Sequence, residues 1–439
     1  MSALIFDIHL NKFINLNFNN KDDIFIENDD NNIKRKFIEI KTDSKLSKYN
    51  EKKIYLPKYS IYDNTFFTFY KSIEKIKRCS KCILPSTIPF IQFDEKGVCS
   101  VCNGYKKVEV LGEDLLRLKT ARFNKNVSGF DSIIALSGGR DSSYGLHYIK
   151  TKLGLNPLAY TYDWGMVTDL ARRNISRLCS MLGVEHIVIS ADIKKKRNNI
   201  RKNVLAWLKN PEIGLIPLFM AGDKQFFYFV NKLKKETGIE NDIWCFNIHE
   251  KADFKEELSG IKMWNYEKDS DKRVAVEMRF SSRLKLAFYY LYNFIKNPSY
   301  INSSLFDSFF AYISYYFVPK NYTSIYDYIK WDEKLIESTI INQYEWETSP
   351  DTPTTWRIGD GTAPFYNYIY FTVCGYSEIE WFRSNQIREN MLTRSEALDI
   401  AMKENLPRWD SIKWYLDTID IDFDFTLKII NNIKKHYNL

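Results

Sequence analysis

A short stretch of the chain combines residue types that hold a phosphate group. Residues 133–146 read Ile-Ile-Ala-Leu-Ser-Gly-Gly-Arg-Asp-Ser-Ser-Tyr-Gly-Leu: an apolar run, a Ser/Gly-rich turn and then a helical pattern. A turn that opens a helix presents several backbone N–H groups to an anion. Two glycines let the backbone approach closely, and three serine hydroxyls can donate hydrogen bonds: Gly138, Gly139, Ser137, Ser142 and Ser143. We therefore predict a phosphate-binding turn.

The same turn contains Asp141, a residue that is unusual in a site for an anion alone. A carboxylate beside phosphates is expected where it helps to hold Mg²⁺. The turn lacks the Gly-Lys-Ser/Thr ending of a Walker A loop and does not have Gly-x-Gly-x-x-Gly spacing. We predict a site for a nucleotide phosphate with Mg²⁺, in which Arg140 also binds the nucleotide.

Four cysteines form two tight pairs ahead of the turn. Cys79 and Cys82 make one Cys-x-x-Cys unit, Cys99 and Cys102 make the other, and residues 83–98 separate them. Each pair can bind one side of a metal ion, and four thiolates suit tetrahedral Zn²⁺ in a closed, structural site. An iron–sulfur cluster is the open alternative, and two disulfides are less expected in an apparently cytosolic chain.

Alternating elements must position these residues. Strands are predicted at 132–136, 157–162 and 186–190, and helices at 142–153 and 169–182, each helix stopped by a glycine. This alternation predicts an α/β fold with a doubly wound parallel sheet. After residue 260 the chain becomes helical and aromatic, with amphipathic stretches at 281–296 and 324–341, a buried aromatic helix at 305–318 and a final helix near 425–436.

Length and composition indicate a multidomain globular protein. The chain has 439 residues, 45% hydrophobic residues and a net charge of +8 that is spread along its length. No secretory signal and no membrane span are visible, so we expect a cytoplasmic protein. We divide the chain into an accessory region (1–70), a cysteine module (71–110), a nucleotide domain (111–260) and a helical substrate region (261–439).

The order Ser-Gly-Gly-x-Asp-Ser after an apolar strand resembles the PP-loop of the ATP pyrophosphatase superfamily. The resemblance implies a site that binds ATP, adenylates an oxygen of the substrate and releases pyrophosphate. In that superfamily the second strand lies beside the adenine. Here that strand supplies Tyr160, Thr161 and Tyr162 as candidates for contacts to the base, and Asp163 as a candidate for the metal or the pyrophosphate.

Further blocks resemble one family, the N-acetyl sugar amidotransferases. They are Cys-x-x-Cys-Ile-Leu-Pro, Cys-x-x-Cys-Asn, Met-Ala-Gly-Asp-Lys-Gln at 220–225, Asn-Ile-His-Glu at 247–250 and Thr-Thr-Trp-Arg-Ile-Gly-Asp-Gly at 354–361. The resemblance implies conversion of an acetamido group into an acetamidino group in surface-glycan biosynthesis. We expect Lys224 to stabilise the pyrophosphate leaving group, Arg357 to bind a sugar carboxylate or phosphate, and Asp360 to bind sugar hydroxyls or the amine.

The source of ammonia and two competing functions complete the sequence-based expectations. A glutaminase needs an activated cysteine, and Cys179, Cys245 and Cys374 lie in patterns typical of packing, so we expect separate glutaminase- and cyclase-like partner subunits, as the resemblance implies. One alternative is a tRNA-modifying PP-loop enzyme, for which the basic run at 194–202 is the nearest candidate surface, although we expect no nucleic-acid partner. The other alternative is a non-enzymatic binding scaffold.

Overall fold

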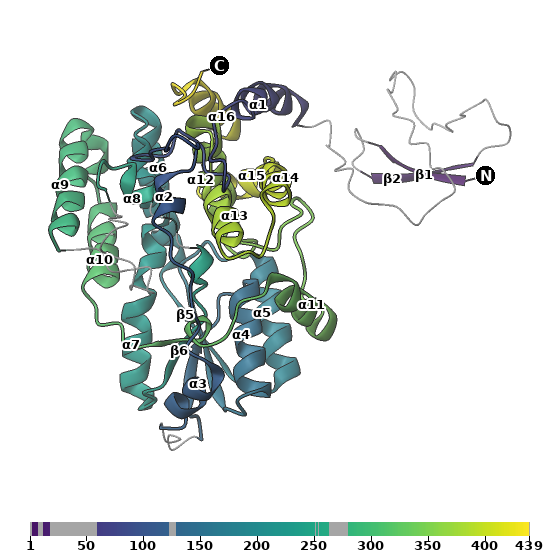
Figure 1. Cartoon of the computed structure of the whole chain (residues 1–439), viewed down its shortest axis with the longest axis vertical. Coiled ribbons are helices and arrows are strands. Elements are labelled where there is room, and N and C mark those ends of the chain that lie inside the picture. Colours follow the sequence, from purple (N-terminus) through teal and green to yellow (C-terminus); the bar gives the residue numbers. More distant parts are fainter. Residues whose placement is uncertain are drawn as a thin grey trace. The chain divides into compact units, whose positions relative to one another are not determined.

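The computed structural model describes residues 2–7, 12–17, 59–122, 129–250, 252, 254–262 and 280–438. Contacts divide the chain into two compact units, Met1–Phe67 and Thr68–Leu439 (Figure 1). In the first unit, β1 (Ser2–Asp7) and β2 (Lys12–Asn17) pair antiparallel, with Ser2 opposite Asn17. Within the predicted accessory region (1–70), residues 8–11 and 18–58 lie outside the described residues.

The second unit is built on a five-stranded parallel sheet with the order β5-β4-β3-β6-β7. Its strands are β3 (Ser132–Ala135), β4 (Pro157–Asp163), β5 (His186–Ser190), β6 (Asp242–Trp244) and β7 (Thr323–Ser324). The chain moves outward from β3 through β4 to β5 and then returns to the other side of β3. The strand order therefore reverses between β3 and β6, where open α/β sheets place their ligands.

Helices connect and cover these strands, as expected for an α/β fold (Figure 1). Between the first four strands lie α4 (Arg140–Thr151), α5 (Asp169–Leu182), α6 (Ile193–Lys209), the 3₁₀ segment η2 (Ile213–Gln225) and α7 (Phe226–Thr237). The prediction for α5 is confirmed at both ends, because the Thr168 hydroxyl caps its first turn and Gly183 adopts the left-handed conformation that ends it. The predicted parallel α/β fold is confirmed.

The remaining helices surround this layer. They are α1 (Ser60–Ile73), α2 (Ser100–Asn103), α3 (Glu113–Thr120), α8 (Phe254–Glu257), α9 (Phe280–Lys296), α10 (Ser304–Tyr316), α11 (Glu333–Tyr344), α12 (Ala363–Cys374), α13 (Glu378–Arg388), α14 (Arg394–Glu404), α15 (Trp409–Thr418) and α16 (Phe423–Asn432). Short 3₁₀ turns occur at Ile248–Glu250, Pro298–Tyr300 and Ile325–Asp327. None of the helices in the described ranges is both long and apolar enough to cross a membrane.

Two expectations for the helical region are corrected. The amphipathic stretch at 324–341 is not one helix: it starts in β7 and a 3₁₀ turn, and α11 begins only at Glu333, where Asp332 caps it. The aromatic helix at 305–318 is buried on one side only: Ala311 is buried, whereas Phe306 is 81% exposed. The expected borders at 110 and 260 do not coincide with a border between compact units. Contacts group Thr68–Leu439 as one unit, and β7 completes the sheet from beyond residue 260.

Candidate active site

A cavity of about 770 Å³ lies at the carboxyl ends of the strands, where the strand order reverses. All four residues predicted to be catalytic line it: Asp141, Lys224, Arg357 and Asp360. Of the residues predicted to bind the nucleotide, the following also line it: Ser137, Gly139, Arg140, Ser142, Tyr160, Thr161 and Tyr162. Gly138, Ser143 and Asp163 do not belong to the lining.

The Ser/Gly turn is closed by its own hydroxyls. The Ser142 hydroxyl accepts a hydrogen bond from the Ser137 N–H (3.2 Å) and donates to the Gly139 carbonyl (3.1 Å). The N-cap of α4 is Gly139, and no side chain caps this end of the helix. The first backbone N–H groups of α4 therefore have no side-chain acceptor at the cap position. The start of α4 therefore has the properties of an anion site.

Gly138 does not line the cavity; it packs against the start of α5. Its φ is +77°, and a Cβ at this position would lie 2.7 Å from the Ala171 carbonyl oxygen at the start of α5. Gly139 has an ordinary φ of −75°, and a Cβ there would touch only the Ser137 hydroxyl, at 3.4 Å. The two glycines therefore serve different purposes: one permits close packing, and the other keeps the backbone open to the cavity.

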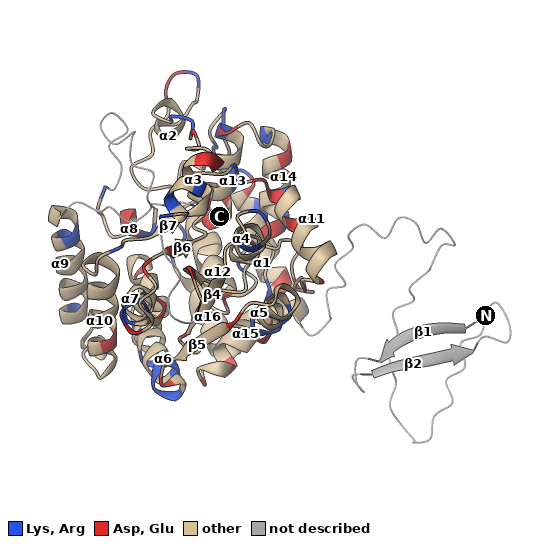
Figure 2. Ribbon diagram, turned by 90° about the horizontal axis from the view of Figure 1, so that it is seen from below, with Lys and Arg blue, Asp and Glu red and all other residues tan. Residues whose placement is uncertain are grey.

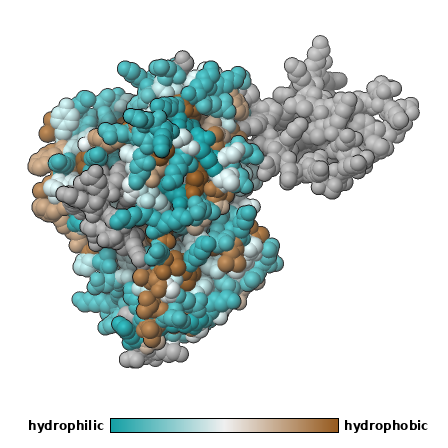
Figure 3. Space-filling view, in the orientation of Figure 1, coloured by the Kyte–Doolittle hydropathy of each residue, from teal (hydrophilic) through white to brown (hydrophobic). Residues whose placement is uncertain are grey.

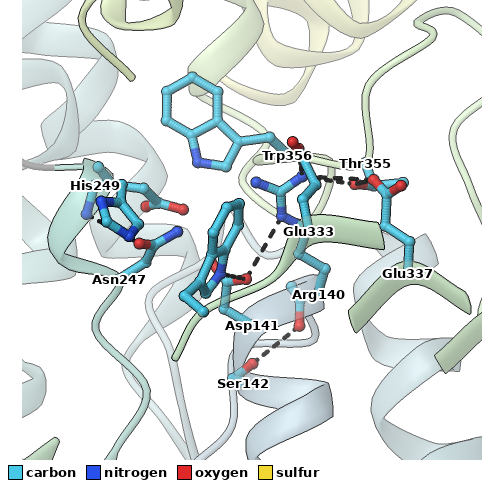
Figure 4. A network of polar contacts seen from close by, with 12 residues as sticks. Arg140, Asp141, Ser142, Asn247, His249, Glu333, Glu337, Thr355 and Trp356 are labelled. Atoms are coloured by element: carbon cyan, nitrogen blue, oxygen red, sulfur yellow. Dashed lines mark hydrogen bonds and ion pairs between the residues drawn. The ribbon is translucent and has the colours of Figure 1, made fainter. Parts of the chain in front are cut away.

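Arg140 connects the turn to the C-terminal part of the chain (Figure 4). Its Nε lies 3.5 Å from the Asp141 carboxylate of the turn. Its guanidinium, 2% exposed, donates to the Glu333 carboxylate (2.5 Å) and to the Thr355 hydroxyl (3.0 Å). Burial raises the pKa of Glu333, but Arg140 and Arg383 outweigh it and hold that pKa at about 2. Arg140, predicted to bind the nucleotide, is thus engaged in a buried ion pair that fixes the turn to α11.

Asp141 faces a second carboxylate. The Trp331 indole N–H donates to the Asp141 carboxylate (2.9 Å), and Glu250 lies beside the same group in the cavity. Burial raises the pKa of Glu250 to about 8, and the negative charge of Asp141 adds to the effect. Two carboxyl groups crowded at the reversal point supply the oxygen ligands that Mg²⁺ prefers.

The loop at 354–362 lies directly on the turn. A Cβ on Gly359 would lie 3.5 Å from the Ser137 carbonyl oxygen and 3.7 Å from the Gly139 nitrogen. The loop is held by the segment after β4, through hydrogen bonds from Thr168 N–H to the Gly359 carbonyl (3.2 Å) and from Gly361 N–H to the Met166 carbonyl (3.0 Å). Residues about 190 to 220 positions apart in the numbering therefore share one wall of the cavity.

Arg357 and Lys224 bring cations to this wall. Arg357 adopts a left-handed backbone conformation (φ +52°), which is strained for a non-glycine residue. Its guanidinium pairs with Glu378 (3.2 Å), which also contacts Lys255. Burial raises the pKa of Glu378, but Arg357 and Lys255 outweigh it and hold that pKa at about 2. The Lys224 ammonium lies 3.3 Å from Asp223 and over the ring of Tyr315.

The residues of β4 mainly pack. Tyr162 donates to Gln225 (3.1 Å) and stacks on Phe229, and Tyr160 is almost fully buried. Asp163 pairs with Arg172 (2.7 Å) and accepts from the Gly165 N–H (2.8 Å), so it stabilises the turn after the strand instead of facing the cavity.

The four cysteines of the two pairs meet in one buried cluster. Their sulfurs all lie within 4.8 Å of one another, with Cys82 and Cys99 3.8 Å apart and Cys79 and Cys102 4.0 Å apart. Four thiolates bonded to one Zn²⁺ at about 2.3 Å in a tetrahedron need sulfur–sulfur separations of about 3.8 Å. The spacing fits a single tetrahedral ion better than a cluster in which each thiolate binds its own iron.

Arg388 ties this cluster to α13. Its guanidinium donates to the Cys102 sulfur (3.3 Å) and to the Cys82 sulfur (3.4 Å). On the same helix, Arg383 contacts Glu333, the partner of Arg140. One helix therefore connects the cysteine cluster to the Ser/Gly turn.

Part of the basic run at 194–202 contacts other parts of the chain. Lys196 is buried, where it donates to Gln225 (2.7 Å) and contacts Asp307, and Arg197 donates to the Gly165 carbonyl (3.0 Å). Arg201 pairs with Asp420 (3.1 Å). These contacts place much of the run's charge against other parts of the chain.

Several residues of the site were not predicted. Glu250 ends the block at 247–250 and Arg388 ends the stretch Phe-Arg-Ser-Asn-Gln-Ile-Arg at 382–388, but neither had an expected role. The remaining ones carry no local motif: Lys255, Trp331, Glu333 and Glu378. Their roles arise from contacts between distant segments, so a single sequence holds little signal for them. His249 itself is buried against Trp331, and burial lowers its pKa.

No protein-family profile matches the sequence, and no curated protein matches it. Among solved structures, an NH3-dependent NAD synthetase from Campylobacter jejuni is 14% identical, with 46% of this chain and 92% of that chain covered and a TM-score of 0.23. A U34-tRNA thiolase from Methanococcus maripaludis, solved with its [4Fe-4S] cluster, is 12% identical, with 79% and 89% covered and a TM-score of 0.28.

Proposed function

We propose that the chain is an ATP-dependent amidotransferase acting on an N-acetyl sugar. The reaction activates the acetamido carbonyl oxygen with the adenylyl group of ATP and replaces that oxygen by ammonia-derived nitrogen, with AMP and pyrophosphate as co-products. The observation that carries the proposal is the meeting of the Ser/Gly turn and the Arg357–Asp360 loop in one cavity. Together they offer a phosphate site and an acceptor site within one enclosure.

One end of the cavity suits the nucleotide. When bound, Mg-ATP would supply the adenylyl group and a pyrophosphate leaving group. The N-terminus of α4 would bind phosphate oxygens, and Asp141 with Glu250 would hold Mg²⁺. Lys224, which also lines the cavity, would compensate negative charge that develops on the leaving group.

The loop side of the cavity suits the acceptor. Arg357 has a planar guanidinium that can bind a sugar carboxylate or phosphate in bidentate fashion. Asp360, whose carboxylate accepts from the Thr362 N–H (2.9 Å), is held in place to bind sugar hydroxyls or the incoming amine. A strained Arg357 backbone, fixed by the contact with Glu378, keeps the guanidinium oriented before the substrate binds.

Ammonia is proposed to come from separate partner subunits. A glutaminase nucleophile must be a thiolate. Burial raises the pKa of Cys179 to about 11 and also raises the pKa of Cys245 and of Cys374, so these thiols are neutral near pH 7. This chemistry favours a glutaminase on another chain.

The cysteine cluster is proposed to hold structural Zn²⁺. The sulfur spacing supports a single ion, and a closed set of four thiolates leaves no open coordination position for catalysis.

The test is a reaction with ATP, Mg²⁺, ammonium and candidate acetamido sugars. The proposal expects AMP, pyrophosphate and a sugar whose mass is lower by the difference between an oxygen atom and an imino group. Tight, salt-sensitive tRNA binding without sugar turnover would favour the tRNA-modifying alternative instead.

A further inference from the structure

Two neighbouring helices present an apolar surface to solvent. Along α9, large apolar residues recur on one side at helical spacing: Phe280, Leu284, Phe288, Leu291 and Ile295. Phe288 and Ile295 are each 67% exposed. On α10, Phe306 and Phe309 are also largely exposed. We call these side chains the α9–α10 face, and Figure 3 shows hydrophobic residues gathered over these helices at the left edge.

The exposure is not explained by loose packing of the two helices. The Tyr312 hydroxyl of α10 donates to the Arg283 carbonyl of α9 (2.7 Å), and the Arg283 guanidinium donates to the Tyr316 carbonyl (2.7 Å). Leu286 is buried between them with aromatic rings around it. The helices therefore use one side to pack and leave the other side apolar, which marks an interaction surface.

The active-site cavity reaches this face. Leu291 and Phe309 belong to the cavity lining, and both side chains are more than half exposed to solvent. Behind them the lining continues through Leu286, Tyr290 and Phe294. The apolar part of the cavity and the apolar part of the surface are thus continuous.

The charges around the face are basic. The α9 sequence contains no Asp or Glu and carries exposed Lys285 and Lys296. Figure 2 shows blue but no red on the α9 ribbon. The acidic residue of α10, Asp307, is in contact with Lys196 and Gln225. At the nearby start of α10, Lys202 donates to Ser303. A partner for this face should be apolar and should tolerate or carry negative charge.

We propose that the α9–α10 face docks the protein on an anionic lipid bilayer. An amphipathic helix with exposed Phe, Leu, Tyr and Ile and with lysines but no acidic residues is the type that lies in the membrane interface. No helix of the described ranges can span the membrane, so the contact is peripheral. The exposed Lys285 and Lys296 beside these apolar side chains complement the negative headgroups of an anionic bilayer.

The experiment is co-sedimentation of the full chain with vesicles of phosphatidylcholine mixed with phosphatidylglycerol, and with phosphatidylcholine alone. The key variant is Phe288→Ser with Ile295→Ser, since neither residue lines the cavity. Phe425→Ser on α16, where the side chain is also more than half exposed, is the matched control. Thermal unfolding and ATP affinity, which both variants should retain, show that the fold and the nucleotide site are intact.

We expect binding to the anionic vesicles, reduced about tenfold or more by the double variant and unchanged by the control. Equal binding by the double variant, or none by the wild type, would overturn the proposal. So would a wild-type dimer that the double variant dissociates in the absence of vesicle binding, because the face would then belong to a second copy. Vesicle binding needs neither ATP nor sugar, so its failure is separate from a failure of the proposed reaction.

Discussion

The Trp331 indole N–H donates to the Asp141 carboxylate across 2.9 Å. This contact joins the phosphate turn after β3 to the segment that leads into α11, which the sequence assigns to a different region. The carboxylate has a fixed donor on one side and Glu250 on the other. Its orientation is therefore set by residues that no local motif reveals.

Asp141→Asn should abolish Mg²⁺-dependent formation of AMP while leaving the fold intact. The amide oxygen can still accept from Trp331, but it is a weaker metal ligand than a carboxylate. We expect the rate to fall by about 100-fold or more. The check is AMP release against the Mg²⁺ concentration, with thermal unfolding as the control. An unchanged Mg²⁺ dependence would show that Asp141 does not hold the ion.

Gly138→Ala and Gly139→Ala should differ sharply. Gly138 has a φ of +77° and lacks room for a Cβ beside Ala171, so we expect a loss of about 1–3 kcal/mol in the free energy of unfolding. Gly139 has an ordinary φ and room for a methyl group, so its variant should retain its stability. Urea unfolding measures both. Equal losses would contradict the division of roles between the two glycines.

Glu333→Gln should be strongly destabilising. Glu333 pairs with Arg140 and Arg383, both nearly fully buried. Arg383 keeps Glu404 when Glu333 is replaced, but Arg140 keeps only the longer contacts with Asp141 (3.5 Å) and Glu337 (3.6 Å). Loss of one partner of a buried pair costs about 3–5 kcal/mol. The exposed pair Lys413–Asp417 offers the control, since Asp417→Asn should change stability by about 1 kcal/mol or less. Similar losses in both variants would refute the role assigned to Glu333.

Stability should fall as the pH rises from about 4 to about 7 because of Asp242. Burial raises the pKa of this carboxyl to about 7, despite the nearby Lys234, while the unfolded chain loses the proton near its ordinary value. Between these two pKa values the folded state holds a proton that the unfolded state has released, so the free energy of unfolding decreases as the pH rises. Above the folded-state pKa of about 7, Asp242 causes no further change in the free energy of unfolding.

Asp242→Asn should remove this part of the pH dependence, because the amide stays neutral. The amide oxygen can still accept the hydrogen bond that the Trp244 indole N–H donates to the Asp242 carboxylate (2.7 Å). The measurement is denaturant unfolding of both proteins from pH 4 to pH 8. Parallel pH profiles would show that Asp242 titrates normally.

Elemental analysis should find a single zinc ion per chain, and Cys99→Ser should weaken its retention. Loss of the ion removes the anchor of Arg388, so α13 should be destabilised together with the cysteine segments. Cys179→Ser, outside the cluster, is the matched control. Iron with acid-labile sulfide in place of zinc would contradict this assignment.

Local signals explain which parts of the fold could be predicted. The turn at 137–143, strand β5 and helix α5 were predictable because apolar runs, glycine stops and the Thr168 cap act over a few residues. The cysteine cluster was predictable from spacing alone. By contrast, the β7 pairing, the Arg140–Glu333 ion pair and the contact of Gly359 with the turn depend on chain closure over long distances.

The incorrect expectations for Asp163 and for the helix at 305–318 also concern contacts between separate segments of the chain. Asp163 ends a strand at the expected edge, yet its side chain pairs with Arg172, and the sequence cannot show which of two nearby polar groups a carboxylate will choose. The aromatic pattern of 305–318 predicted burial because exposed aromatic faces are uncommon on monomers. The exposed side of this helix forms an apolar surface together with the exposed side of α9.

The central claim is tested most directly by the nucleotide products of the purified chain with ATP, Mg²⁺, ammonium and an acetamido sugar. The account predicts AMP and pyrophosphate in equal amounts with an acetamidino sugar, and loss of all three in Asp141→Asn. Release of ADP and phosphate, or AMP formation that does not depend on the sugar, would contradict it.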